Sequence, residues 1–243
     1  DIFMAWSDNP WILDVAAVRV SIVGFDNGSQ PNRTLDGRYV ETINSDLTAS
    51  INVASAAFLT ENASLAFKGP SPGGSFDIPE STASRLLSER NLSGKTNRDV
   101  VRPVLNAADI TSRSRNYWTI DFGPNLPEGE AKKYEAVYQY VLEHVYPERK
   151  NNRRKAYREK WWLYQEARVG LREAVARLNH RYIVTPRVAK HRLFIWVDKQ
   201  VMANDACIAI ARDDDYFFGV LHSRYHELWS LRMGTWLGVG NDP

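Results

Sequence analysis

The sequence predicts an α+β protein with mixed, mostly antiparallel strands and a few long helices. Three observations lead to this class: short segments with alternating apolar residues, longer segments with apolar residues every three or four positions, and no regular strand–helix–strand alternation. The 243 residues are 44% hydrophobic and 25% charged, which is typical of globular proteins and is enough to form a core. This composition argues against long disordered segments, collagen-like sequence and coiled coil.

The first half of the chain contains mostly strand candidates. Residues 15–25 alternate between apolar and polar side chains, which predicts a strand, and Asp8–Pro10 before them are interpreted as a turn. Three glycines and two prolines predict a loop over 68–75. Further strands are expected at 39–43, 65–67, 100–105 and 118–122, and a short helix at 81–89.

The second half contains the longer helices. Apolar residues at three- and four-residue spacing predict one helix from Ala131 to Val145. Pro147 suits the first turn of a second helix, which is expected to run to about Leu178 with a bend at Gly170. The last helix is predicted over 216–233, with a core-facing stripe formed by Phe218, Leu221, Tyr225 and Leu228. Strands are expected between these helices at 181–185, 193–197 and 206–211.

The chain has a single cysteine, Cys207, and no long apolar segment. One cysteine cannot form an internal disulfide or a cysteine zinc cluster, and its apolar neighbours predict a buried strand position in a reducing compartment. The longest apolar run, 206–211, is about a third of the length that a membrane span needs, and no segment is typical of a signal peptide. We therefore expect a soluble, cytoplasmic protein with no membrane partner.

Positive charge is concentrated in one region. The formal net charge is +2, but residues 144–192 hold fourteen lysines and arginines against four glutamates, a local charge of +10, so the rest of the chain sums to −8. This asymmetry indicates a polyanion-binding face, although a helix rich in arginine and lysine is more often only solvated.

Two histidines provide an alternative function. His222 and His226 are four residues apart, as in zinc hydrolases, but the glutamate that follows the first histidine in those enzymes is missing and no third ligand is identified. A metal-dependent hydrolase and a module that docks a protein partner are therefore the two alternatives. Asp213–Asp215 directly precede the last helix, which favours a role as helix caps. No phosphate-binding glycine loop, nucleophile elbow or cysteine–histidine pair is found.

Several sequence blocks are distinctive in combination, although none is a catalytic signature. They are 6–25, 67–69 with 74–77, 101–106 with 109–110, 118–123, 182–192 and 217–229. With these blocks the chain resembles MmeI-like DNA methyltransferases, the type IIL branch of single-chain restriction-modification enzymes, over nearly its whole length. It departs from the family at Val15, where members usually have glycine, and it stops at Pro243 inside a segment that members continue.

The resemblance implies the target recognition domain of an adenine-N6 DNA methyltransferase. Residues 1–27 are then the last strands of the catalytic domain, and 28–243 form the target recognition domain. In the family the S-adenosylmethionine loop, the Asn-Pro-Pro-aromatic motif and the nuclease all lie upstream, so this fragment is expected to be inactive, with no catalytic residue, metal or cofactor of its own. S-adenosylmethionine would belong to the parent enzyme, whose methyltransferase and nuclease domains would be partners in the same chain.

Double-stranded DNA is the expected external partner. Basic side chains of 149–158 and of the turn at 186–192 are predicted to contact phosphates: Arg149, Lys150, Arg153, Arg154, Lys155, Arg158, Arg187, Lys190, His191 and Arg192. The candidates for reading base edges lie in and after the last helix, where the resemblance implies base contacts: Ser223, Arg224, Asn241 and Asp242.

Overall fold

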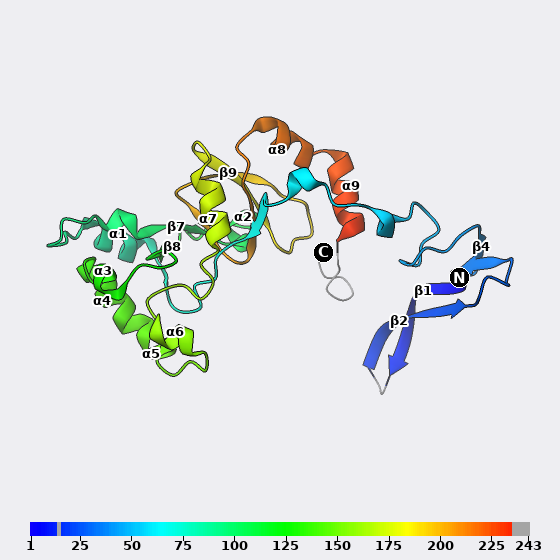
Figure 1. Ribbon diagram of the computed structural model, residues 1–243, viewed down its shortest axis with the longest axis horizontal. Helices are drawn as coiled ribbons and strands as arrows, with labels where there is room; N and C mark the ends of the chain where they lie inside the picture. The colour runs from blue at the N-terminus through cyan, green and yellow to red at the C-terminus, as the bar shows by residue number, and fades with distance from the viewer. Residues whose placement is uncertain (14–15, 235–243) are drawn as a thin grey trace. The chain divides into compact units, whose positions relative to one another are not determined.

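The computed structural model describes residues 1–13 and 16–234 (Figure 1). The chain forms two compact units, an N-terminal unit over Asp1–Thr60 and a C-terminal unit that begins at Glu61. Short sheets occur in both units, and the α-helices of the described residues belong to the C-terminal unit. The predicted α+β class is therefore confirmed. The whole of segment 1–27 lies within the N-terminal unit, whose boundary falls later in the chain.

The N-terminal unit is one four-stranded sheet in the order β2-β1-β3-β4 (Figure 1). Its strands are β1 (Ile2–Leu13), β2 (Ala16–Phe25), β3 (Arg33–Leu35) and β4 (Arg38–Val40). β1 pairs antiparallel with β2 and parallel with β3. Among the described residues of this unit only Ala5 is a buried hydrophobic side chain, whereas Trp11, Phe25 and Tyr39 are exposed. The sheet therefore has almost no core of its own.

Asp8–Pro10 lie inside β1, so the predicted turn before the first strand was wrong. Two features make a strand compatible with the proline. A register shift between Trp6 and Asn9 interrupts the pairing with β2, and β3 pairs with β1 at Met4 and Ala5 but not further along. β1 is thus an edge strand at Pro10, where a missing backbone N–H is tolerated.

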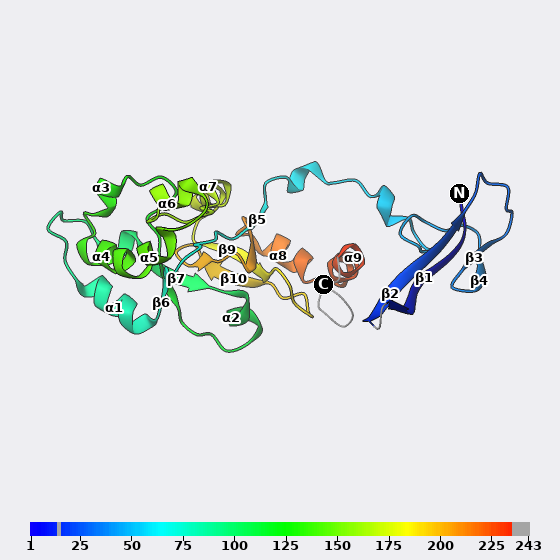
Figure 2. The same cartoon turned by 90° about the horizontal axis from the view of Figure 1, so that it is seen from below.

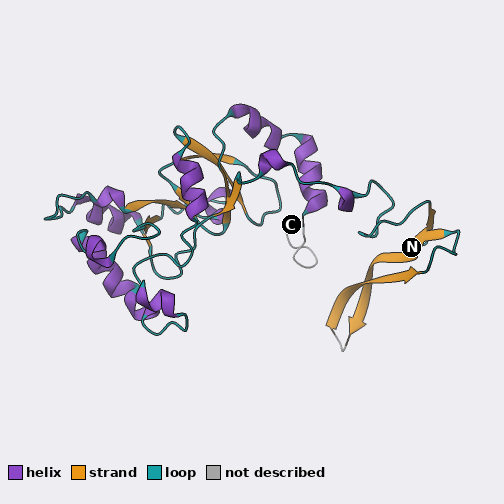
Figure 3. Ribbon diagram, in the orientation of Figure 1, coloured by secondary structure: helices purple, strands orange, loops and turns teal. Residues whose placement is uncertain are grey.

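The C-terminal unit contains two further four-stranded sheets (Figure 3). The first is antiparallel, in the order β10-β9-β12-β5, and comprises β5 (Ala66–Lys68), β9 (Arg181–Pro186), β10 (Ile195–Asp198) and β12 (Cys207–Ile210). The second, in the order β11-β7-β8-β6, comprises β6 (Asp77–Ile78), β7 (Val101–Leu105), β8 (Trp118–Ile120) and β11 (Met202–Ala203). The six strands predicted in this unit are confirmed. β6 and β11 have two residues each, too few to show an alternation.

The helices of the C-terminal unit are short (Figure 3). They are α1 (Glu80–Ser88), α2 (Ala107–Thr111), α3 (Glu128–Ala131), α4 (Glu135–His144), α5 (Tyr146–Arg149), α6 (Lys155–Glu159), α7 (Val169–Ala176), α8 (Asp215–Leu221) and α9 (Arg224–Met233). The described residues also form three 3-10 turns: Val53–Ser55 in the N-terminal unit, Thr60–Asn62 where the first unit ends, and Asn97–Asp99 in the C-terminal unit.

The largest core joins α1, α3 and α4 to the β7–β8 sheet (Figures 1 and 2). Leu86 of α1, Val137 of α4 and Ile120 of β8 have no exposed surface. The predicted stripe from Ala131 to Val145 is buried here, as the spacing indicated, but it is divided between α3 and α4. A second core lies under β9 and β12, and a third lies between these strands and α8.

The long helix predicted from Pro147 to Leu178 was wrong, because α5, α6 and α7 replace it. The four consecutive residues Trp161–Tyr164 are all buried, which no single face of a helix can achieve. The chain then pairs with the loop at 68–75: the backbone N–H groups of Gln165 and Glu166 donate to the carbonyls of Pro72 and Ser71, at 3.2 and 3.1 Å. These N–H groups are therefore not available to a helix.

The last predicted helix is also divided, into α8 and α9, because Ser223 starts a new helix as its N-cap. Leu221 is buried as predicted, but Tyr225 is 87% exposed and Leu228 is 50% exposed, so the core-facing stripe does not continue into α9.

Cys207 is fully buried in β12, as its apolar neighbours predicted, and its Sγ lies 3.8 Å from the carbonyl oxygen of Leu105. Within 1–13 and 16–234, no helix is both long enough and apolar enough to cross a membrane.

Candidate functional site

Arg149, predicted to contact phosphates, is a buried structural residue, and that prediction is corrected. Its side chain is 1% exposed, and its guanidinium donates to the carbonyls of Gly73 at 3.2 Å, of Leu163 at 3.0 Å and of Pro72. It also lies over the ring of Phe76, at 5.4 Å from the centroid. Burial lowers the pKa of Arg149. This arginine connects the loop at 68–75 to α5 and cannot reach a ligand in solvent.

The other predicted cations of this region are exposed on and around α6. We call them the α6 cluster: Lys150, Arg153, Arg154, Lys155 and Arg158. Their contacts are local and solvated. Arg154 donates to the Tyr157 hydroxyl at 3.0 Å, Arg158 donates to the carbonyl of Asn152 at 2.7 Å, and Lys155 pairs with Glu159 at 3.6 Å. One carboxylate among five exposed cations leaves a positive surface that can bind phosphates without a large desolvation cost.

The second predicted basic segment, Arg187–Arg192, follows β9 directly. Arg187 is anchored to the start of β12, because its backbone N–H donates to the carbonyl of Ala206 at 2.9 Å and its guanidinium to that of Asp205 at 3.2 Å. Ala189 is buried, whereas Lys190 and His191 are exposed and Arg192 is half-buried. The turn is thus held at both its start and its middle, with charged side chains on its outside.

The candidates for base reading fall into two groups. Ser223 caps α9, where its hydroxyl accepts from the backbone N–H of His226 at 3.2 Å, so this oxygen already has a structural role. Arg224 is exposed and pairs with Glu227 at 2.5 Å. Asn241 and Asp242 lie outside the described residues.

His222 and His226 are packed around an aromatic ring. The Phe194 ring centroid lies 5.7 Å from His222 and 5.4 Å from His226, and His222 Nε2 lies 3.2 Å from the Phe194 carbonyl. Burial lowers the pKa of His226. In the part of the chain that the structure describes, no three histidine, cysteine or acidic side chains converge as metal ligands. The two histidines therefore join α8 and α9 to the segment after β9.

Of the three aspartates at the start of α8, one caps the helix as expected. Asp214 accepts from the backbone N–H of Phe217 at 2.8 Å, and the hydrogen bond from Arg212, followed by this one, lowers the pKa of Asp214. Asp213 instead accepts from the backbone of Asn179, and Asp215 pairs with Arg181 at 2.8 Å.

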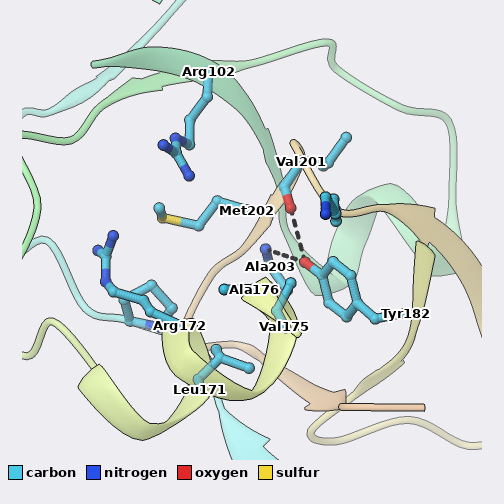
Figure 4. Close-up of a pocket in the computed structure, with 11 residues that line it drawn as sticks. Arg102, Leu171, Arg172, Val175, Ala176, Tyr182, Val201, Met202 and Ala203 are labelled. Carbon is cyan, nitrogen blue, oxygen red and sulfur yellow. Dashed lines mark hydrogen bonds between the residues drawn. The ribbon is translucent and has the colours of Figure 1, made fainter. Parts of the chain in front are cut away.

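A cationic cavity in the C-terminal unit was not predicted (Figure 4). It has a volume of about 200 Å³ and is lined by Arg102 of β7, Arg172 of α7 and Lys199 above apolar side chains such as Leu171 and Met202. The three cations come from separate parts of the sequence, and each is isolated among apolar or mixed neighbours. No local charge pattern could therefore reveal the cavity.

Comparison with known proteins shows a similarity in structure but none in sequence family. No protein-family model matches the chain, and no curated protein is found as a relative. The fold is similar to that of the type IIL restriction-modification enzyme MmeI, solved in complex with DNA, with a TM-score of 0.67 and 16% sequence identity. The match covers 97% of this chain and 33% of the MmeI chain, so this chain spans about a third of that protein's length. The resemblance inferred from the sequence blocks is thus matched in the fold.

Proposed function

We propose that this chain binds double-stranded DNA as the target recognition domain of a restriction-modification enzyme. The observation that carries the proposal is the fold similarity over 97% of the chain to an enzyme solved with DNA. The exposed α6 cluster and the turn at 187–192 support it independently, because exposed arginines and lysines supply the sequence-independent part of DNA affinity.

Replacing Arg153, Arg154 and Lys155 with alanine is expected to weaken binding to all duplexes alike. Each phosphate contact that is lost reduces the number of counterions released when the protein binds DNA. The slope of log affinity against log salt concentration should therefore flatten by about 0.9 per contact. Fluorescence anisotropy of labelled duplexes at several salt concentrations measures both quantities.

A matched control removes the same three positive charges elsewhere. Arg85, Lys132 and Lys133 are exposed and lie on or beside α1 and α3. Alanine at these positions should leave the slope unchanged. If both triple variants behave alike, or if the α6 variant keeps the affinity and slope of the original chain, the cluster does not contact DNA.

We further propose that the parent enzyme is an S-adenosylmethionine-dependent adenine-N6 methyltransferase of the cytoplasm. This part rests on the sequence blocks of the MmeI-like family. In this proposal residues 1–27 complete the sheet of a catalytic domain, which agrees with the nearly coreless sheet of the N-terminal unit. The methyltransferase and nuclease domains, and the cofactor, belong to the remainder of the parent chain.

Within the parent enzyme, Arg224→Ala is expected to relax the choice of base at one position of the recognised site. Arginine can donate two hydrogen bonds to guanine, and such a contact discriminates by about 1–3 kcal/mol. Arg224 is exposed and its ion pair with Glu227 is on the surface, so breaking this pair to contact a base costs little free energy. Sequencing of methylated sites measures the result, and an unchanged site for this variant would remove Arg224 from the base-reading residues.

A further inference from the structure

Arg102 is a partly buried cation whose Nε has no hydrogen-bond partner. The nearest carboxylate oxygen, Asp121 Oδ2, lies 4.0 Å from this nitrogen, beyond hydrogen-bond distance. Asp121 is already engaged: Arg172 donates to its two oxygens at 2.7 and 3.0 Å, and the backbone N–H of Gly123 donates to Oδ1 at 3.0 Å. Since a buried donor without a partner costs free energy, Arg102 requires an explanation.

The space in front of Arg102 is the cavity of about 200 Å³ described above. Figure 4 shows the guanidinium groups of Arg102 and Arg172 directed into the same space beside Met202. A neighbouring cavity of about 470 Å³ shares Arg102 and Lys199 and adds Arg98 to its lining. Arg102 and Lys199 therefore line both cavities.

The charges around the smaller cavity do not balance. Its lining contains three cations and no carboxylate, and Asp121, bound to Arg172, offsets one of the three. Lys199 donates one hydrogen bond, to the carbonyl of Leu178 at 3.0 Å, and retains two further donors. Two positive charges thus remain above an apolar floor, and both are accessible to an anion, because the Arg102 side chain is 34% exposed and Lys199 is exposed.

The arrangement favours a particular anion. The cations approach the cavity from β7, from α7 and from the segment before β11, so a ligand must present oxygens in several directions. A tetrahedral dianion does so, whereas a planar carboxylate presents two oxygens in one plane with a single charge. We propose that the cavity lined by Arg102, Arg172 and Lys199 binds a phosphate group, either of a small phosphate-bearing molecule or of a nucleic-acid backbone.

The first experiment titrates the 243-residue chain with inorganic phosphate by calorimetry in a chloride buffer at pH 7.5. We expect saturable binding that is at least tenfold weaker in Arg102→Gln and in Lys199→Gln. Arg90→Gln is the matched control, because Arg90 is an exposed arginine outside the cavity, and it should bind phosphate like the original chain. Acetate, a planar monoanion, should bind at least tenfold more weakly than phosphate.

Thermal unfolding distinguishes a binding role from a structural one. Phosphate should raise the unfolding midpoint of the original chain and of Arg90→Gln but not that of Arg102→Gln. If Arg102→Gln unfolds at a lower temperature without phosphate and still binds phosphate normally, Arg102 is only a structural neighbour of Asp121 and the proposal is wrong. Absence of saturable phosphate binding to the folded original chain would overturn it as well.

Binding measurements with duplex DNA distinguish the two possible sources of the phosphate group. If Arg102→Gln loses phosphate binding and also binds duplex DNA more weakly, and phosphate competes with DNA, the ligand is a backbone phosphate. If phosphate binding is lost while DNA affinity is unchanged, the ligand is a separate phosphate-bearing molecule. This inference does not depend on the proposed function, because phosphate binding by a chain that binds no DNA would contradict only the latter.

Discussion

Arg149→Met should lower the free energy of unfolding of the C-terminal unit by about 3 kcal/mol or more. The substitution keeps much of the side-chain volume but removes the donors to the carbonyls of Pro72, Gly73 and Leu163. The carbonyls of Pro72 and Gly73 still accept from Gln165, at 3.2 and 3.3 Å, whereas that of Leu163 loses the Arg149 donor, which costs about 1–3 kcal/mol. Each of the two other lost bonds came from a charged donor and contributes about 1.5–3 kcal/mol. Urea unfolding followed by tryptophan fluorescence measures the loss, since Trp161 and Trp162 lie in the same core.

Two further variants identify the cause of this loss. Arg149→Lys keeps a positive charge but lacks the planar guanidinium that donates to several carbonyls at once. We therefore expect an intermediate loss in the free energy of unfolding. Arg153→Met changes an exposed residue a short distance along the chain and should alter stability by no more than about 0.5 kcal/mol. Equal stability of Arg149→Met and Arg153→Met would show that the buried hydrogen bonds do not hold the loop at 68–75.

Asp121→Ala should have an effect of similar size, about 3–5 kcal/mol. The Asp121 side chain is 1% exposed and receives two hydrogen bonds from Arg172, so its removal leaves a largely buried cation without a counter-charge. Removing one partner of a buried ion pair costs more than the pair contributes, because the remaining charge stays desolvated. Chemical unfolding in a phosphate-free buffer measures this loss.

A double-mutant cycle tests the origin of the effect. Arg172→Met should recover part of the stability that Asp121→Ala loses, because the double variant no longer contains the Arg172 charge without its counter-charge. Asp215→Ala is the surface control: this aspartate also pairs with an arginine, but its side chain is 80% exposed, and we expect a change within about 0.5 kcal/mol. Additive losses in the cycle would contradict an interaction between Asp121 and Arg172.

The sequence predicted those parts of the fold in which local pattern and tertiary environment agree. The alternation in β2, the strands of the C-terminal unit and the buried stripe of α3 and α4 are all local signals that the structure confirms. The region after Pro147 differs, because its structure depends on distant partners. Gln165 and Glu166 bond to the loop at 68–75, which no local periodicity can indicate.

The same distinction applies to the candidate site. The α6 cluster is contiguous in sequence, so charge density alone located it. Charge density could not separate Arg149 from its neighbours, since only the folded loop makes this arginine a buried donor. The phosphate cavity unites Arg102, Arg172 and Lys199 from three elements and therefore has no counterpart in a linear pattern.

The burial of Cys207 gives the protein a built-in kinetic reporter. Burial raises the pKa of this thiol from 9.0 to about 12, so in the closed structure it is neither accessible nor ionised at pH 8. A thiol reagent can therefore react only after the sheet formed by β12 and its neighbours has opened. Because the chain has no other cysteine, the labelling rate follows this one opening event without background from a second thiol. Measured without denaturant, with and without DNA or phosphate, the labelling rate would show whether binding of either ligand slows the opening of the sheet that contains β12.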